Sequence, residues 1–242
     1  MPATMIKHVL LAVGLLLAAP GVTHAGGPAA PGSSPSRLAE LAQQAEFVAL
    51  AQVRDTDYLR RRDIPVSGSA YLKVLIPYKG DASTDLVEVY EKGLLEHECY
   101  FPNPTLFEEG RRYLLFLRRD PENPERYRGL PAGCAVDVLV DEDNAYAVRL
   151  PVTGIELSDP LAGIARPMRF SDPYAVVDDD ALPPALRDAM QAAGQIVPYA
   201  PLSPGSEPGP AGLPRPATEP SLRWRYTQGV SLGDFRELMG LD

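Results

Sequence analysis

The chain has 242 residues, with 32 Asp and Glu against 23 Lys and Arg, so its formal net charge is −9 at pH 7. A charge of this sign repels nucleic acid and anionic lipid, and we therefore expect no nucleic-acid partner. The length and a hydrophobic fraction of 45% allow one ordinary domain with extensions, or two small domains, around a sizeable core.

The first 25 residues have the composition of a secretory signal peptide. Lys7 supplies the positive charge, residues 9–19 are apolar, and Thr23 and Ala25 are the small residues before a predicted cleavage after Ala25. The apolar stretch is shorter than the ~20 residues of a membrane-spanning helix, so cleavage is favoured over a membrane anchor and we expect no membrane span. The signal holds one Lys and no acid, so cleavage leaves a charge of −10 on a secreted or periplasmic protein.

A short helix is predicted after a flexible leader. Residues 26–35 are rich in Gly, Pro and Ser and present no apolar face, which is typical of a flexible segment. Ser36 fits a helix N-cap, and helical spacing relates the apolar residues Leu38, Leu41, Ala42 and Ala45. We expect this helix to cover one end of a sheet.

The apolar pattern changes to a period of two between residues 47 and 149. It predicts six short strands, at residues 47–53, 70–76, 86–90, 113–117, 136–140 and 146–150. The fourth of these strands is apolar on both faces, which indicates that it is covered from two sides at the centre of the core. Strands joined by local turns, with no helix between them, argue against a parallel α/β sheet. We therefore predict a mainly β protein with a small closed or nearly closed β-barrel over residues 36–150.

The pattern weakens after the barrel. We interpret residues 151–196 as an extension whose one clear helix, 183–193, is preceded by Asp179 or Asp180 and stops at Gly194. We expect this helix to pack on the barrel. Residues 197–220 are rich in proline and glycine and are predicted to form a semi-extended linker.

The last segment, residues 221–242, returns to an apolar pattern, and we interpret it as a docking segment. A disordered tail lacks large apolar residues, because they expose surface that water disfavours. Ser231, followed three residues later by Asp234, fits the start of a helix. The groove that receives the segment belongs either to this chain's own barrel or to a partner. The predicted docking residues are Trp224, Tyr226, Leu232, Phe235, Leu238 and Met239.

Cys99 and Cys134 are the two cysteines of the chain. An oxidising compartment favours a disulfide between them, which would act as a structural staple. The alternative is a zinc site in which His97 and a carboxylate join the two thiolates, although the chain lacks the paired-ligand spacing of known zinc sites. We expect the disulfide, and no bound metal or cofactor.

Three stretches of the barrel region resemble one known superfamily. Residues 45–53 (AEFVALAQV), 71–80 (YLKVLIPYKG) and 110–117 (GRRYLLFL), flanked by the two cysteines, resemble the bacterial branch of the tissue-inhibitor-of-metalloprotease-like, or netrin-module-like, superfamily. The resemblance covers residues 45–150 and implies an OB-type barrel. It does not imply protease inhibition, because those inhibitors place an amino-terminal cysteine on the protease metal, whereas the cleaved chain begins at Gly26.

No catalytic motif stands out in the sequence. After cleavage His97 is the single histidine, so any Ser-His or Cys-His arrangement needs it, and its neighbour Cys99 is expected to be oxidised. The acidic runs 141–144 and 178–180 lack the alternating ligands of a calcium loop. We interpret them as a solvated turn and a charge run before a helix, with calcium binding left open.

Two classes of function remain. We favour an exported, non-catalytic binding or interaction module of the cell envelope, because a barrel without a catalytic motif is followed by an apolar tail. The alternative is a secreted hydrolase that uses carboxylates in a barrel cleft, since such pairs have no sequence signature. Buried acids clustered in one concave pocket would favour the hydrolase, and a smooth barrel with acids scattered over its surface would favour the module. The arginine groups 60–62, 111–112 and 118–119 are interpreted as solvated strand ends.

Overall fold

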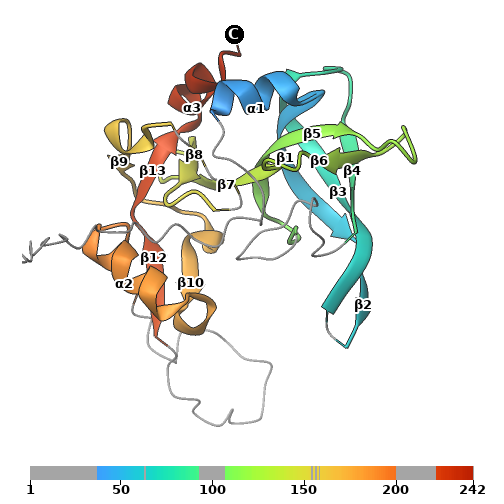
Figure 1. The fold of residues 1–242 in the computed structure, drawn as a ribbon. Coiled ribbons are helices and arrows are strands. Elements are labelled where there is room, and N and C mark those ends of the chain that lie inside the picture. Colours follow the sequence, from blue (N-terminus) through green and yellow to red (C-terminus); the bar gives the residue numbers. More distant parts are fainter. Residues whose placement is uncertain are drawn as a thin grey trace, which may run out of the picture.

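The fold comes from a computed structural model, which describes residues 37–62, 64–92, 107–153, 155, 157, 159–199 and 222–241. The described part is mainly β, as the sequence predicts, with one large sheet, one small sheet and three α-helices (Figure 1). Several predictions lie outside the described residues: the signal peptide, the leader and Ser36, the proline-rich residues 200–220, and His97 with Cys99.

Five strands of the large sheet close into a small barrel. They are β1 (Phe47–Thr56), β3 (Ile64–Lys79), β4 (Leu86–Glu91), β5 (Arg112–Arg119) and β6 (Tyr127–Gly129). Around the barrel the order is β1-β3-β4-β6-β5, and β5 pairs again with β1. Neighbours are antiparallel except for β4 and β6, which are parallel. This order is that of an OB-type barrel, and the predicted fold class is confirmed.

The large sheet continues past the barrel on the far side of β5. The additional strands are, in order, β7 (Ala135–Val140), β8 (Tyr146–Arg149), β13 (Gln228–Ser231) and β9 (Arg166–Pro167). All six predicted strands exist, but the last two, β7 and β8, lie outside the closed ring. The ring is completed instead by β6, whose three residues are too few to show an alternating pattern in the sequence.

The second sheet is antiparallel and small. Its strands are, in order, β10 (Val176–Asp178), β12 (Arg223–Tyr226) and β11 (Ile196–Tyr199). Helix α2 (Pro184–Ala192) confirms the helix predicted at residues 183–193. Its buried Met190 shares an apolar cluster with Leu139 and Ala147 of the large sheet. The two sheets are therefore joined by apolar packing.

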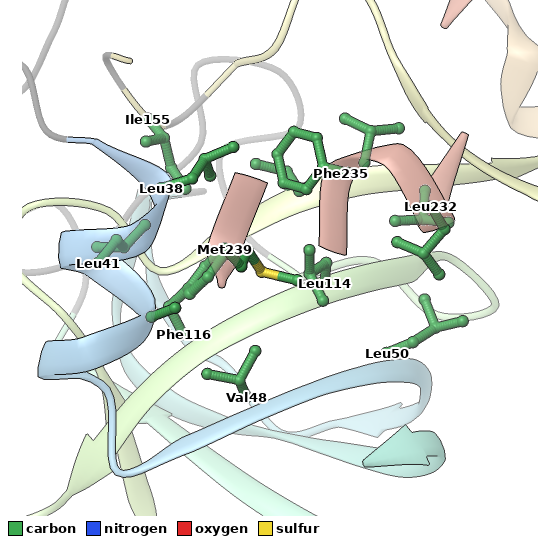
Figure 2. Packing of buried hydrophobic residues seen from close by; sticks show 14 of the residues in the cluster. Leu38, Leu41, Val48, Leu50, Leu114, Phe116, Ile155, Leu232, Phe235 and Met239 are labelled. Atoms are coloured by element: carbon green, nitrogen blue, oxygen red, sulfur yellow. The ribbon is translucent and has the colours of Figure 1, made fainter. Parts of the chain in front are cut away.

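Strands β1 and β5 separate two apolar clusters. Tyr113 of β5 faces the barrel interior. Leu50 of β1 and Leu114 of β5 face outward, into a second cluster that α1 (Leu38–Gln44) and α3 (Leu232–Met239) cover (Figure 2). A strand that is buried on both faces has a continuous apolar run, which explains the sequence of β5.

Distant side chains bind both ends of α1. At the start of the helix, the N–H of Leu38 donates to Asp159 Oδ2 at 2.7 Å. At its end, Lys79 Nζ donates to the carbonyl oxygens of Ala42 and Gln43, at 3.0 and 2.8 Å. A cation that binds the last carbonyls of a helix also interacts favourably with the helix dipole. Lys79, from the stretch 71–80 that carries part of the family resemblance, therefore has a structural role.

Candidate ligand-binding face

The structure packs the predicted docking residues against this chain. Trp224 and Tyr226, each 4% exposed, lie on β12 and join the apolar cluster beneath α2. The others belong to α3 and the cluster outside the barrel: Leu232, Phe235 and Met239, which are buried, and Leu238, which is partly buried. Ser231 Oγ accepts a hydrogen bond from the Asp234 N–H at 3.1 Å, so the predicted helix start is confirmed. In this fold these side chains pack in the chain's own apolar clusters.

Cys134 is 1% exposed and belongs to the cluster inside the barrel. It is not a free thiol. Its predicted partner Cys99, and His97 of the zinc alternative, lie outside the described residues, so the disulfide stays a prediction. Within the ranges that the structure describes, no group of three or more His, Cys, Asp or Glu side chains is placed to hold a metal ion.

Both acidic runs contain a carboxylate that is committed to the fold. Asp141 Oδ1 accepts hydrogen bonds from two backbone N–H groups of its own turn, at 2.9 and 2.8 Å. Asp179 accepts from the Trp224 indole N–H at 2.7 Å and from the Arg187 guanidinium at 3.0 Å. These two hydrogen bonds lower the pKa of Asp179. The first run is thus a turn, and the second holds α2 and β12 together.

Four carboxylates are buried in the described part of the chain, and each has a partner. Three of them are bound to arginines at nitrogen–oxygen distances of 2.6 to 3.1 Å: Asp120 to Arg126 and Arg128, Asp137 to Arg111 and Arg149, and Asp172 to Arg112. The fourth, Glu91, accepts from the Tyr58 hydroxyl at 2.5 Å. Burial and the negative charge of Glu91 raise the pKa of Tyr58. None of these partners is a second carboxylate, which a glycosidase needs opposite the first.

Among the described residues, the wall of the barrel formed by β3 and β4 carries polar and aromatic side chains on its outer side. The helices α1 and α3 lie over β1 and β5 at the other wall (Figure 1). On the outer side of β3 and β4, Tyr71 pairs with Glu88, and Lys73 pairs with Leu86. Leu86 is 57% exposed, whereas the alternate residue Leu72 lies inside the barrel. We name this surface the β3–β4 face and define it by Tyr71, Lys73, Leu86, Glu88 and Tyr90.

The loop between β5 and β6 borders the β3–β4 face. The Arg126 guanidinium lies over the Tyr90 ring, with its Cζ 3.6 Å from the ring centroid, and Arg126 Nε donates to Asp120 Oδ2 at 2.6 Å. Burial by itself raises the pKa of Asp120, but hydrogen bonds from the Glu122 N–H and from Arg126 outweigh burial, and the pKa is lowered. The ionised Asp120 thereby holds the guanidinium on the tyrosine ring.

A network of hydrogen bonds lies at the edge of the β3–β4 face, where β3 begins to pair with β4. The Ser69 N–H donates to Asp57 Oδ1, and Ser69 Oγ donates to Glu88 Oε1, both at 2.6 Å. The Tyr71 hydroxyl donates to Asp57 Oδ2 at 3.3 Å. Desolvation, and then the negative charges of Asp57 and Glu88, raise the pKa of Tyr71. Tyr71 is therefore a neutral hydrogen-bond donor on this surface.

The composition and place of the β3–β4 face make it the candidate ligand-binding surface among the described residues. Tyrosine and arginine are enriched where proteins bind partners. In OB-type barrels the second and third barrel strands and the adjacent loops form the ligand-binding face, and here those strands are β3 and β4. This face could not be recognised from the sequence, because the outward residues of a half-buried strand are ordinarily just solvated. The available signal was the outward Tyr71 and Leu86 among charged neighbours.

Comparisons with protein-family models, with curated proteins and with solved structures found no match for this chain. The resemblance to the tissue-inhibitor-of-metalloprotease-like superfamily therefore stays a prediction. Among the described helices, none combines the length and the apolar character needed to cross a membrane.

Proposed function

We propose that this protein is a non-catalytic binding module that acts after export, in the periplasm or outside the cell, and that the β3–β4 face binds its ligand. The observation that carries the proposal is the arrangement of Tyr90 under Arg126, which Asp120 holds in place. Side chains that are already fixed lose little conformational entropy on binding. The exposed Leu86 supplies apolar contact area on the same face.

Hydrolysis by carboxylates has less support. The four buried carboxylates are bound to arginine or tyrosine side chains and lie on separate elements. Their partners hold these carboxylates in fixed orientations, and the pKa of Asp120 is lowered, whereas a catalytic acid needs a raised pKa. The buried carboxylates of the described residues are therefore not clustered with one another, although the hydrolase hypothesis requires such a cluster.

Two double variants test the assignment of the face. Y71A/L86A removes a tyrosine and an exposed aliphatic side chain from the β3–β4 face, and Y199A/V197A removes the same kinds of residue from β11, where Val197 is 43% exposed. Each protein is immobilised and incubated with an envelope extract, and the captured molecules are quantified by mass spectrometry. We expect at least one molecule that the unchanged protein and the β11 variant retain equally and that Y71A/L86A captures about tenfold less.

Equal capture by all three proteins would remove the β3–β4 face from the proposal. Turnover of a glycan or peptide substrate by the unchanged protein would contradict its non-catalytic part. Export is tested separately by amino-terminal sequencing of the protein recovered from the periplasm and the medium. Gly26 is the expected first residue, and a retained Met1 would contradict cleavage.

A further inference from the structure

A β-hairpin extends beyond the barrel between β1 and β4. Strand β2 (Leu59–Arg61) pairs with the first residues of β3, with Leu59 opposite Ser67, and Arg62 lies in the turn with φ at +50°. Figure 1 shows the hairpin pointing away from the barrel, at the end opposite α1 and α3. All three β2 residues are exposed, and Leu59 is 56% exposed.

The arginines of the hairpin differ from those of the core. Arg60, Arg61 and Arg62 are exposed, and none of them makes an ion pair with another described residue. The nearby acid Asp57 is already engaged, since its carboxylate accepts from the Ser69 N–H and the Tyr71 hydroxyl. With Asp63 included, residues 59–64 carry a formal charge of +2 in a chain of −9. The core arginines, in contrast, are bound to carboxylates: Arg111, Arg112, Arg126, Arg128 and Arg149.

We propose that the tip of this hairpin binds the headgroups of an anionic phospholipid surface. This contact goes beyond the proposed function and does not use the β3–β4 face. A guanidinium group binds phosphate oxygens through two parallel hydrogen bonds. An arginine that is not bound to a carboxylate has both of these bonds available for a headgroup. Leu59, next to Arg60, supplies an apolar side chain that enters the boundary between headgroups and acyl chains.

The shape of the hairpin favours binding to a lipid surface over binding to a protein partner. A stable protein interface buries about 800 Å² on each partner and involves about 20 to 30 residues. The exposed tip, residues 59–62, is far smaller and is convex, so it encloses nothing. A layer of lipid headgroups supplies many phosphates to a convex tip and needs no complementary pocket.

The length of the hairpin reconciles the proposal with the acidic charge of the chain. The first pair between β3 and β4 joins Gly68 to Glu91, so residues 64–67 lie beyond the end of β4. Four residues of strand span about 13 Å. Charges are screened over ~8 Å at physiological ionic strength. The acidic body therefore stands outside the range of strong repulsion when the tip touches the surface.

Co-sedimentation with vesicles tests the proposal, with the full chain purified after export. Vesicles of phosphatidylcholine and phosphatidylglycerol are compared with vesicles of phosphatidylcholine alone. We expect binding to the anionic vesicles only, and its loss at high salt. Because each arginine at such a surface strengthens binding about fivefold, R60Q/R61Q/R62Q should bind about 100-fold less. L59A should also bind the anionic vesicles more weakly than the unchanged protein does.

The matched control is R166Q/R169Q/R236Q, which removes the same charge from exposed arginines on other elements and should bind as the unchanged protein does. Unchanged melting temperatures show that the variants fold. Equal binding by the hairpin variant and the control would overturn the proposal. Displacement of vesicles by inorganic phosphate at constant ionic strength would also overturn it, in favour of a single phosphate site. Binding of polyglutamate but not of vesicles would overturn it in favour of an acidic protein.

Discussion

Arg149 on β8 and Asp137 on β7 form a buried ion pair, with 2.7 Å between Arg149 Nε and Asp137 Oδ2. The same guanidinium lies 4.5 Å from the centre of the Tyr226 ring on β12, and its Nη2 donates to Thr153 Oγ1 at 3.0 Å. Burial by itself lowers the pKa of Arg149, but Tyr226 and Asp137 outweigh burial, and the pKa is raised. One permanently charged side chain therefore joins the large sheet to the carboxyl-terminal segment.

Replacing Arg149 with Ala tests this connection. The change removes one of the two arginines that bind the buried Asp137 and removes the contact with Tyr226. Loss of one partner of a buried ion pair costs about 3–5 kcal/mol of unfolding free energy, and we expect R149A to lose this much in urea denaturation. The control is Arg169→Ala, an exposed arginine for which we expect a change below about 0.5 kcal/mol. Similar losses in both variants would contradict a specific role of Arg149.

Asp120 predicts a dependence of stability on pH. Its pKa in the folded chain is lowered, so ionised Asp120 contributes stability above its pKa in the unfolded chain, about 3.9. This contribution is lost as the pH falls through the lower pKa of the folded state. D120N should therefore be less stable than the unchanged protein at neutral pH, by a margin that shrinks below about pH 4. Urea unfolding across this pH range measures the margin.

The matched control for D120N is Glu125→Gln, which removes an exposed acid from the same loop. We expect its stability to follow that of the unchanged protein at every pH. A margin between D120N and the unchanged protein that stays constant from pH 7 to the acid limit would show that Asp120 stabilises the fold without its charge. The guanidinium of Arg126 would then be held on Tyr90 by other contacts.

The barrel could be predicted from the sequence because its longer strands are half-buried or doubly buried. Leu72 and Lys73 fall on opposite sides of β3, and residues 113–117 of β5 are all apolar because the barrel interior and the helices cover the two faces of this strand. The short strand β6 could not be predicted, since three residues carry no period. The contact of Lys79 with the end of α1 also could not be predicted, because the lysine comes from a residue far along the chain.

The composition of the carboxyl-terminal segment predicts that it is docked and contains a helix, but it does not predict its strands. Its large apolar residues correctly indicate a docked segment, and Ser231 marks the helix start. The strands β12 and β13 were not predicted, because they are ordered by remote pairing: Trp224 lies opposite Val177, and Val230 lies opposite Val148. Four-residue strands become recognisable only when such neighbours are known.

The candidate site was less accessible to sequence reasoning than the fold. Tyr71 and Leu86 lie close together because β3 and β4 are paired in one register. Arg126 contacts Tyr90 from the loop between β5 and β6. These four residues are separated in the sequence and belong to no motif. Only the order of the strands around the barrel brings them together at the β3–β4 face.

The predicted disulfide between Cys99 and Cys134 has a direct test. Mass spectrometry of the exported protein after thiol blocking should show both cysteines unmodified and joined in one cross-linked peptide. Cys134→Ser should then lower the unfolding free energy by about 2–5 kcal/mol, because the closed loop constrains the unfolded chain. Alkylation of both thiols in the native exported protein would refute the disulfide.

The carboxyl-terminal segment predicts a spectroscopic signature. Trp224, the single tryptophan of the chain, is buried, and its indole N–H donates to Asp179 at 2.7 Å. Its fluorescence emission should therefore be blue-shifted in the isolated protein and should move to longer wavelength on unfolding. A water-exposed emission from a folded chain would contradict the packing of β12 in the second sheet.

Phe235 provides the matching test for α3. Its side chain is fully buried in the cluster between α1 and the outer side of the barrel, as Figure 2 shows. Deleting a buried phenylalanine costs about 3–5 kcal/mol, so Phe235→Ala should lose this much unfolding free energy, while the exposed Leu222→Ala should lose almost none. Truncation after Pro220 removes β12, β13 and α3 together, leaving β9, β10 and β11 each without a strand partner and β8 with only β7. We therefore expect the truncated chain to lose cooperative unfolding, and a cooperative transition close to that of the full chain would show that the barrel does not depend on this segment.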